Sequence, residues 1–239
     1  MAGPARTFGK PLPYLKLGRP KGKLIAIEGT DGVGRSTQVA LLQQWLEVRG
    51  FPVMVTGWTR SNLMSRAIDA AKSGHALNRL TLSLLYATDF ADRLENNIVP
   101  ALRAGFVVLA DRYIYTAMAR DAVRGADPDW IRNVLGFALV PDLVCYLDID
   151  LAHLSPRVLA SGGMNYWESG MDLRLGEDLF DSFSRYQTAM IQEFERMSKE
   201  FGFTVIDARR DIDSVQTDLR EAIGSVVTTK KGAARAGQG

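Results

Sequence analysis

The stretch that decides the fold is IEGTDGVGRST, residues 27–37. It follows a short apolar run and opens a segment, 36–49, whose apolar residues recur at helical spacing. The stretch matches the phosphate-loop pattern G-x-x-x-x-G-K-[ST], except that Arg35 stands where the pattern has lysine. Between a strand and a helix, such a loop turns backbone N–H groups inward and lies at a helix N-terminus, which favours an anion. The stretch therefore predicts a site for nucleotide phosphates.

The loop also predicts which residues contact ATP. The expected contacts are Gly29, Gly32, Val33, Gly34, Arg35, Ser36 and Thr37. The Ser36 hydroxyl is expected to bind Mg²⁺, which bridges the β- and γ-phosphates of ATP. Arg35 keeps the positive charge of lysine, but its planar fork is not geometrically equivalent. Two interpretations stay open: Arg35 contacts the phosphates from a different angle, or it weakens phosphoryl transfer.

Beyond the loop, short apolar runs alternate with longer helical patterns. The expected strands are 24–28, 53–56, 106–110, 143–149 and 203–206, and the expected helices are 36–49, 80–103, 129–139, 178–200 and 212–226. Near-continuous apolar runs suit strands that are buried on both faces. The pattern predicts an α/β, P-loop NTPase-type domain with a doubly wound five-stranded parallel sheet flanked by helices, over 23–227. Pro100 is expected to bend or break the helix at 80–103 near its end.

The two ends differ from the middle of the chain. Residues 1–22 hold four of the nine prolines and no helical period, so we expect an arm in which Tyr14–Leu17 could add an edge strand. Residues 228–239 are small, polar and basic, which predicts a flexible tail.

The amino-acid composition excludes several classes of protein. Hydrophobic residues make up 46% of the 239 residues, which excludes a disordered or fibrous chain. The apolar runs are too short to cross a bilayer, and the first residues lack the core of a secretory signal. One cysteine and two histidines are too few to form a metal centre built from those residue types. With 29 basic and 27 acidic residues, the net charge gives no indication of nucleic-acid binding. We expect a soluble cytoplasmic protein with no membrane and no nucleic-acid partner.

Several phrases together resemble one family. Residues 27–38 closely resemble the first motif of bacterial thymidylate kinases, and further similar phrases follow in the family's order at 85–89, 98–102, 105–113 and 141–148. The resemblance spans 23–227. It implies a nucleoside monophosphate kinase that transfers the γ-phosphoryl of ATP to dTMP, giving dTDP and ADP, and that commonly forms homodimers.

The resemblance also implies roles for matching residues. Asp31 would reach the deoxyribose 3′-hydroxyl of the acceptor. Asp111 would hold the Mg²⁺ shell through water, beside Ser36. Arg112 would lie across the transferring phosphoryl or the acceptor phosphate, and Arg35 and Arg112 would stabilise the phosphoryl group. Arg35, Asp111 and Arg112 are thus the expected catalytic residues.

The acceptor site departs from the family's pattern. Phe90 stands where the family has an acceptor-binding arginine, and Arg93, one helical turn on, is a possible substitute. Arg60 is a possible substitute for a second lost arginine. Arg120 and Asp121 replace a Tyr-Gln pair whose glutamine reads thymine, which puts thymine specificity in doubt.

The expected lid, about 157–176, departs as well. Arg157 and Glu168 align with lid residues of the family, whereas Tyr166 replaces one of two arginines expected between them. A Gly-rich, aromatic segment suits a flap that excludes water, and Tyr166 and Trp167 could stack on a base.

These departures leave two alternatives to dTMP kinase activity. The first is a kinase for a different or modified nucleoside monophosphate. The second is a non-catalytic nucleotide-binding protein that uses closure as a switch, which Arg35 and the missing lid arginines favour.

Overall fold

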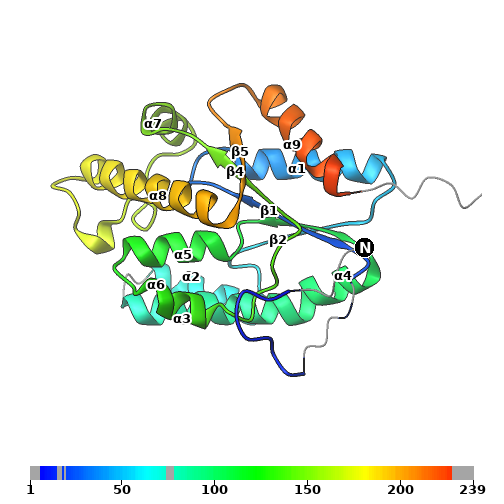
Figure 1. Ribbon diagram of the computed structural model, residues 1–239. Helices are drawn as coiled ribbons and strands as arrows, with labels where there is room; N and C mark the ends of the chain where they lie inside the picture. Colours follow the sequence, from blue (N-terminus) through cyan, green and yellow to red (C-terminus); the bar gives the residue numbers. More distant parts are fainter. Residues whose placement is uncertain (1–5, 15–17, 19, 74–77, 228–239) are drawn as a thin grey trace, which may run out of the picture.

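The computed structural model describes residues 6–14, 18, 20–73 and 78–227, and it contains one five-stranded sheet (Figure 1). The strands are β1 Lys23–Glu28, β2 Val53–Gly57, β3 Val107–Asp111, β4 Leu143–Asp148 and β5 Thr204–Asp207. They lie in the order β2-β3-β1-β4-β5, and every neighbouring pair is parallel. The predicted α/β class and parallel sheet are confirmed. The strand order reverses at β1, so the carboxyl end of β1 faces the crevice where such sheets bind ligands.

Helices cover both faces of the sheet. They are α1 Arg35–Val48, α2 Ser65–Ser73, α3 Arg79–Arg93, α4 Val99–Ala104, α5 Ile114–Val123, α6 Pro128–Val134, α7 Leu151–Ala160, α8 Leu179–Phe201 and α9 Ile212–Val226. Figure 1 shows α1, α7 and α9 above the sheet and α3, α4, α5 and α6 below it. Alternate residues of β1 pack on opposite faces of the sheet. Leu24 and Ala26 pack with α3, α5 and α8. Ile25 and Ile27 pack with α1 and α9. The core is therefore two apolar layers that share one sheet.

The expected helix at 80–103 is divided differently from the prediction. A π-helical turn, η1 Leu94–Ile98, separates α3 from α4, and Pro100 lies in the first turn of α4. A proline there removes an N–H that the first helical turn leaves free, so Pro100 does not break the helix. The wider turn just before it supplies the irregularity.

Further helices differ from the prediction. The expected helix at 129–139 is the shorter α6, because the backbone at 136–139 pairs with the N-terminal arm instead. Helices α2 and α5 were not predicted. Seven of the ten residues of α5 are buried and the other three are half-buried, so no face of α5 is exposed to solvent.

Part of the expected arm is described and is packed on the domain. Thr7 forms an antiparallel bridge with Leu139, and Phe8 N–H donates to the Ala138 carbonyl at 3.0 Å. The Phe8 ring lies 5.5 Å from the rings of both Tyr115 and Phe201. Residues 15–17 of the proposed edge strand and the tail 228–239 lie outside the described residues.

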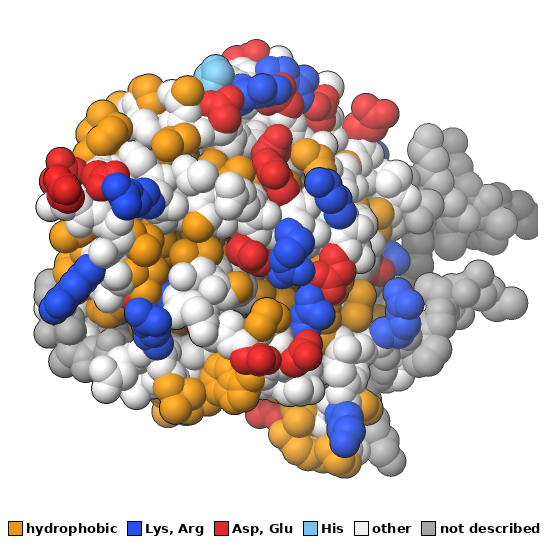
Figure 2. Space-filling view, turned by 60° about the vertical axis from the view of Figure 1, so that its left-hand side comes forward, with side chains coloured by type: hydrophobic (Ala, Val, Ile, Leu, Met, Phe, Trp, Pro, Cys, Tyr) orange, Lys and Arg blue, Asp and Glu red, His pale blue; other side chains and the backbone are white. Residues whose placement is uncertain are grey.

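The surface is mixed in charge on the face shown in Figure 2, where basic and acidic side chains are interspersed with apolar groups. Among the helices of the described residues, none combines the length and the hydropathy that crossing a bilayer requires.

Helix α5 begins beside the carboxyl end of β1 and is capped from there. Its own N-cap residue, Tyr113, supplies no side-chain cap. Glu28, the last residue of β1, accepts the Tyr113 N–H at 2.8 Å, the Thr116 N–H at 3.4 Å and the Thr116 hydroxyl at 2.5 Å. Burial raises the pKa of Glu28 to about 7, against the opposing effect of these hydrogen bonds.

This buried carboxyl predicts a pH-dependent stability. Glu28 holds its proton more tightly in the folded chain (pKa about 7) than in the unfolded chain (4.5), so raising the pH through this window destabilises the fold. The loss amounts to about 2 to 3 kcal/mol between pH 5 and pH 8. Glu28→Gln carries no such charge. We expect urea unfolding of both proteins to show the variant gaining that amount over the wild type across this range; a difference that stays constant with pH would contradict the assignment.

Candidate active site

The phosphate loop lies where β1 passes into α1. Gly34 is the N-cap of α1 and has a left-handed backbone (φ 98°). Gly32 is also left-handed (φ 81°), and a Cβ there would lie 2.4 Å from the Val158 side chain on α7. A residue with a side chain would strain both positions, because the left-handed region favours glycine. The two glycines thus fix the turn that exposes the N-terminus of α1.

Arg35 is folded into this loop and is only 5% exposed. Its Nη1 donates to the carbonyl oxygens of Gly29 and Thr30, and its Nε donates to Asp111 Oδ1 at 3.1 Å. One planar fork thereby ties the loop to the end of β3. A lysine has one nitrogen in place of this planar fork, so it would not reproduce these contacts in the same geometry.

Ser36 and Asp111 bring two oxygen ligands together. The Ser36 hydroxyl donates to Asp111 Oδ2 at 3.1 Å, at the carboxyl end of β3. Hard oxygen donors of this kind fit Mg²⁺, which usually keeps several waters and binds substrate phosphates as well. Among the described residues, no cluster of three or more His, Cys, Asp or Glu side chains could hold a metal by itself.

Two arginines converge on Asp31 of the loop. Arg112 Nη2 donates to Asp31 Oδ1, and Arg120 Nη2 donates to Asp31 Oδ2 at 3.0 Å. Both guanidinium groups are largely buried, at 17% and 18% exposure. Burial, and then the neighbouring charge of Arg120, lower the pKa of Arg112 to about 9. Two cations that share one carboxylate leave excess positive charge, which suits an anionic ligand.

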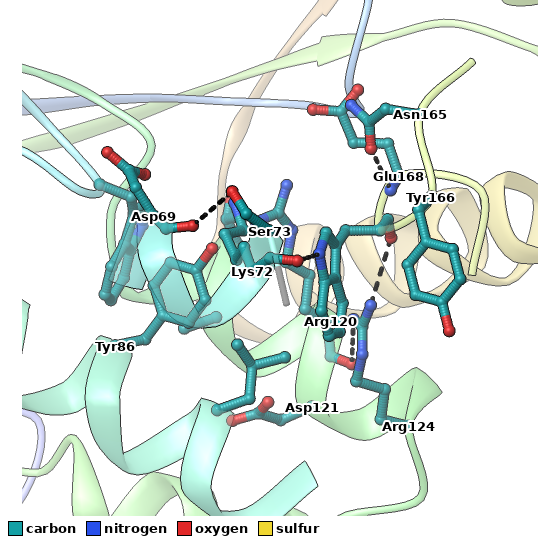
Figure 3. A pocket seen from close by; sticks show the side chains of 15 residues that line it. Asp69, Lys72, Ser73, Tyr86, Arg120, Asp121, Arg124, Asn165, Tyr166 and Glu168 are labelled. Carbon is teal, nitrogen blue, oxygen red and sulfur yellow. Dashed lines mark hydrogen bonds between the residues drawn. The ribbon is translucent and has the colours of Figure 1, made fainter. Parts of the chain in front are cut away.

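A cavity of about 450 Å³ opens beside these arginines (Figure 3). Figure 3 shows Asp69 and Tyr86 on one side, Tyr166 and Glu168 on the other, and Arg120 between them. The full lining comprises Trp58, Asp69, Lys72, Ser73, Leu82, Tyr86, Thr116, Ala117, Arg120, Asp121, Arg124, Asn165, Tyr166, Trp167 and Glu168. Aromatic walls with a few convergent charged groups are typical of a small-molecule site, and the volume falls in the range of ligand pockets.

The expected lid residues close this cavity against α2. The Trp167 indole Nε1 donates to the Lys72 carbonyl of α2 at 3.1 Å. Arg124 holds the same segment from below, since its Nη2 donates to the Trp167 carbonyl at 3.3 Å and to Asp172 at 3.2 Å. Glu168 and Tyr166 line the mouth of the cavity. The segment thus covers this side of the crevice.

The cavity wall also holds a buried carboxyl group. Asp121 is 8% exposed, and its Oδ2 accepts the Ser83 hydroxyl at 2.5 Å. Burial raises its pKa above the ordinary aspartate value. Asp121 supplies a hydrogen-bonding group on a wall whose other members include Leu82 and Tyr86.

Three residues expected at the acceptor site lie elsewhere. Phe90 is fully buried in the core, where its ring contacts Tyr113 at 5.1 Å between centroids. Arg93 is 1% exposed and donates to Asp89 at 2.9 Å, behind Trp58. Arg60 is exposed and does not line the cavity. The face of α3 that carries Phe90 and Arg93 packs inward, so neither side chain reaches a ligand in the cavity.

Arg157 also differs from its expected place. It belongs to α7 and donates to the carbonyl oxygens of Ala208, at 2.8 Å, and Val33, at 3.4 Å. It therefore joins the phosphate loop to the segment after β5 and does not line the 450 Å³ cavity. A second cavity, of about 280 Å³, lies there; its lining includes Gly34, Thr37, Arg157, Arg210 and Ile212.

Sequence reasoning missed several residues around the site. Trp58 and Tyr86 line the cavity with ring centroids 5.4 Å apart, and Glu28 and Arg124 hold its framework. Tyr86 lies inside the phrase 85–89 that carried the resemblance, so its position was the available signal. Glu28 likewise lies inside the phrase 27–38. Arg124 gave no signal, because its side-chain partners Asp172 and Tyr186 are distant in sequence.

Comparisons with known proteins agree with this geometry. The family model described as thymidylate kinase matches residues 27–219. The chain is 39% identical to "Probable thymidylate kinase 2" of Saccharolobus solfataricus over 87% of this chain and 98% of that protein. It is 36% identical to "Thymidylate kinase" of Clavibacter michiganensis subsp. michiganensis, over 83% and 93% of the two chains. It is 31% identical to "Probable thymidylate kinase" of Pyrococcus horikoshii, over 83% and 94%. A phosphate loop beside a nucleotide-sized cavity, and a family match over most of its length, show that this chain belongs to the thymidylate kinase family.

Proposed function

We propose that this chain transfers the γ-phosphoryl group of ATP to dTMP, yielding ADP and dTDP. The observation that carries the proposal is the convergence of Arg112 and Arg120 on Asp31, between the phosphate loop and the large cavity. The named relatives, each called a thymidylate kinase, support dTMP as the acceptor. Phosphoryl transfer depends on positioning and charge more than on covalent chemistry, and this site provides both.

The two cavities suit the two substrates. The smaller one touches Val33, Gly34 and Thr37 of the loop region, which supports its assignment to the nucleoside part of ATP. The larger one is lined by Thr116 and Arg120, beside Asp31, which supports its assignment to the acceptor nucleotide. The loop between them would hold the donor phosphates.

The chain's own residues suffice for an in-line transfer. An oxygen of the acceptor phosphate attacks the γ-phosphorus, and the bond from that phosphorus to the bridging oxygen of ADP breaks. No general base is needed, because the acceptor phosphate is already anionic at neutral pH. Arg35 and Arg112 would balance the charge on the transferring oxygens. A Mg²⁺ ion held by Ser36 and Asp111 would neutralise the β- and γ-phosphates when bound.

We also infer that the active form is a homodimer and that it works in the cytoplasm. Leu80 and Leu84 of α3 are 58% and 44% exposed, one helical turn apart, and would give a helical contact face. The one cysteine, Cys145, is buried and unpaired, which fits a reducing compartment.

The direct test is ADP release by the purified protein with ATP and Mg²⁺ against dTMP, dUMP, dCMP, dGMP, UMP, AMP and no acceptor. We expect release that depends on dTMP and exceeds the rate without acceptor at least tenfold. A different preferred acceptor would overturn the assignment of dTMP and focus attention on Asp121. Tight ATP binding with no release across the panel would instead support a nucleotide-dependent switch.

A second prediction concerns Arg35. Arg35→Lys should lower kcat on the order of 10²-fold, because one ammonium cannot hold Asp111 and both loop carbonyls while facing the phosphates. The matched control is Arg49→Lys at the exposed end of α1, which should leave kcat unchanged. A gain in kcat in Arg35→Lys would show that the site works better with the lysine of the usual pattern.

A further inference from the structure

Glu28 links the phosphate loop to the acceptor cavity. It is the residue immediately before Gly29, and it is fully buried. Its hydroxyl partner, Thr116, lines the acceptor cavity. Helix α5, which carries Arg120, has no side-chain cap of its own, so this carboxyl group is its only side-chain cap among the described contacts. An anion at a helix N-terminus is favourable, because the first N–H groups lack partners within the helix.

The same contacts fix the direction of Arg112. Arg112 has a left-handed backbone (φ 71°), which is strained for a residue with a side chain. Its N–H donates to the Ile27 carbonyl at 3.1 Å, and the next N–H, of Tyr113, donates to Glu28. Two adjacent residues of β1 therefore hold two adjacent residues of the turn after β3. Without the second contact, the turn is free to relax to an ordinary conformation, and the Arg112 side chain would leave Asp31.

We propose that Glu28, as a carboxylate, is a positioning residue for phosphoryl transfer: it caps α5 from β1 and thereby holds Arg112 and Arg120 around Asp31. The inference rests on the proposed function, since it assigns these arginines to the acceptor phosphate. Glu28 touches neither substrate cavity itself and acts through Tyr113 and Thr116.

The negative charge matters to this arrangement. As a carboxylate, Glu28 accepts two backbone N–H groups at Oε1 and the Thr116 hydroxyl at Oε2. A protonated carboxyl or an amide can still accept the N–H groups and donate to the Thr116 hydroxyl, but it lacks the negative charge that the N-terminus of α5 favours. The charged or titratable groups around Glu28 are Arg35 of the loop, Arg112 of the turn, Tyr115 of α5 and, across the sheet, Tyr146 of β4. Burial makes Glu28 titrate near neutrality, so its charge changes within the working range of pH.

The test compares Glu28→Gln with the wild type from pH 5.5 to pH 8.5 at saturating ATP and dTMP. At pH 8 we expect kcat of the variant to be lower on the order of 10²-fold, as for a misplaced catalytic group, with KM for ATP within about threefold. The ratio of variant to wild-type kcat should rise toward one as the pH falls below about 7, because wild-type Glu28 then loses its charge too. Ionisation of the substrate phosphates cancels in this ratio. A ratio that is constant with pH, or a change in KM for ATP alone, would overturn the proposal.

Thr116 supplies a second, milder pair of variants. Its hydroxyl lowers the pKa of Glu28, so Thr116→Val should move the acid limb of the kcat profile to higher pH, and Thr116→Ser should restore it. A Thr116→Val profile that superimposes on the wild type would contradict the role of Glu28, even if Glu28→Gln does not fold.

A readout without substrate separates this proposal from the proposed function. In ¹H–¹⁵N spectra, the backbone amides of Tyr113 and Thr116 should titrate near pH 7 in the wild type, and the guanidinium Nη–H groups of Arg112, which bind Asp31, should lose their protection from exchange below that pH. Neither transition should occur in Glu28→Gln. If both transitions occur but the protein does not phosphorylate dTMP, the proposed kinase activity is wrong and the role of Glu28 stands. If the protein phosphorylates dTMP but shows neither transition, the role of Glu28 is wrong and the activity stands.

Discussion

Buried charge must be paired, and this constraint organises the whole crevice at the carboxyl ends of β1 and β3. Asp111 pairs with Arg35, and Asp31 pairs with Arg112 and Arg120. The third buried acid, Glu28, is satisfied by hydrogen bonds from Tyr113 and Thr116 instead. Each pair joins elements that are distant in the chain: the loop to β3, and the loop to α5. The phosphate loop is thus held by side chains on its inner side, while its glycines keep the backbone N–H groups available to a ligand.

The same pairing explains why the site suits an anion. The arginines and the acids nearly balance in the protein alone, but Glu28 is committed to capping α5, so Asp31 is shared between two cations. A phosphate group placed beside Asp31 would relieve the excess positive charge and gain charge-assisted hydrogen bonds. Glu28 lowers the stability of the fold but supports the proposed activity. Burial of its carboxylate costs free energy of folding, whereas its charge orders the turn that carries Arg112.

Local features of the sequence were enough to predict the parallel sheet and the phosphate loop. Near-continuous apolar runs predict buried parallel strands, and the glycine spacing predicts the phosphate loop. Neither inference depends on other parts of the chain. Helix α5 escaped prediction because it is buried nearly all round, and the inward direction of Phe90 and Arg93 depended on which face of α3 meets the sheet. The Glu28–Thr116 contact joins residues 88 positions apart, so no spacing rule could reveal it. Tertiary packing, rather than local preference, decided each of these.

The most direct test of this account is the affinity of dTMP relative to thymidine, measured by calorimetry for the wild type and for Arg112→Ala. If Arg112 and Arg120 receive the acceptor phosphate, wild-type protein should bind dTMP on the order of 10²-fold more tightly than thymidine, since two charge-assisted hydrogen bonds contribute about 3 kcal/mol. In Arg112→Ala, the ratio of dTMP affinity to thymidine affinity should fall at least tenfold, and the affinity for thymidine should be unchanged. An equal preference for dTMP in both proteins would contradict the assignment of these arginines to the phosphate.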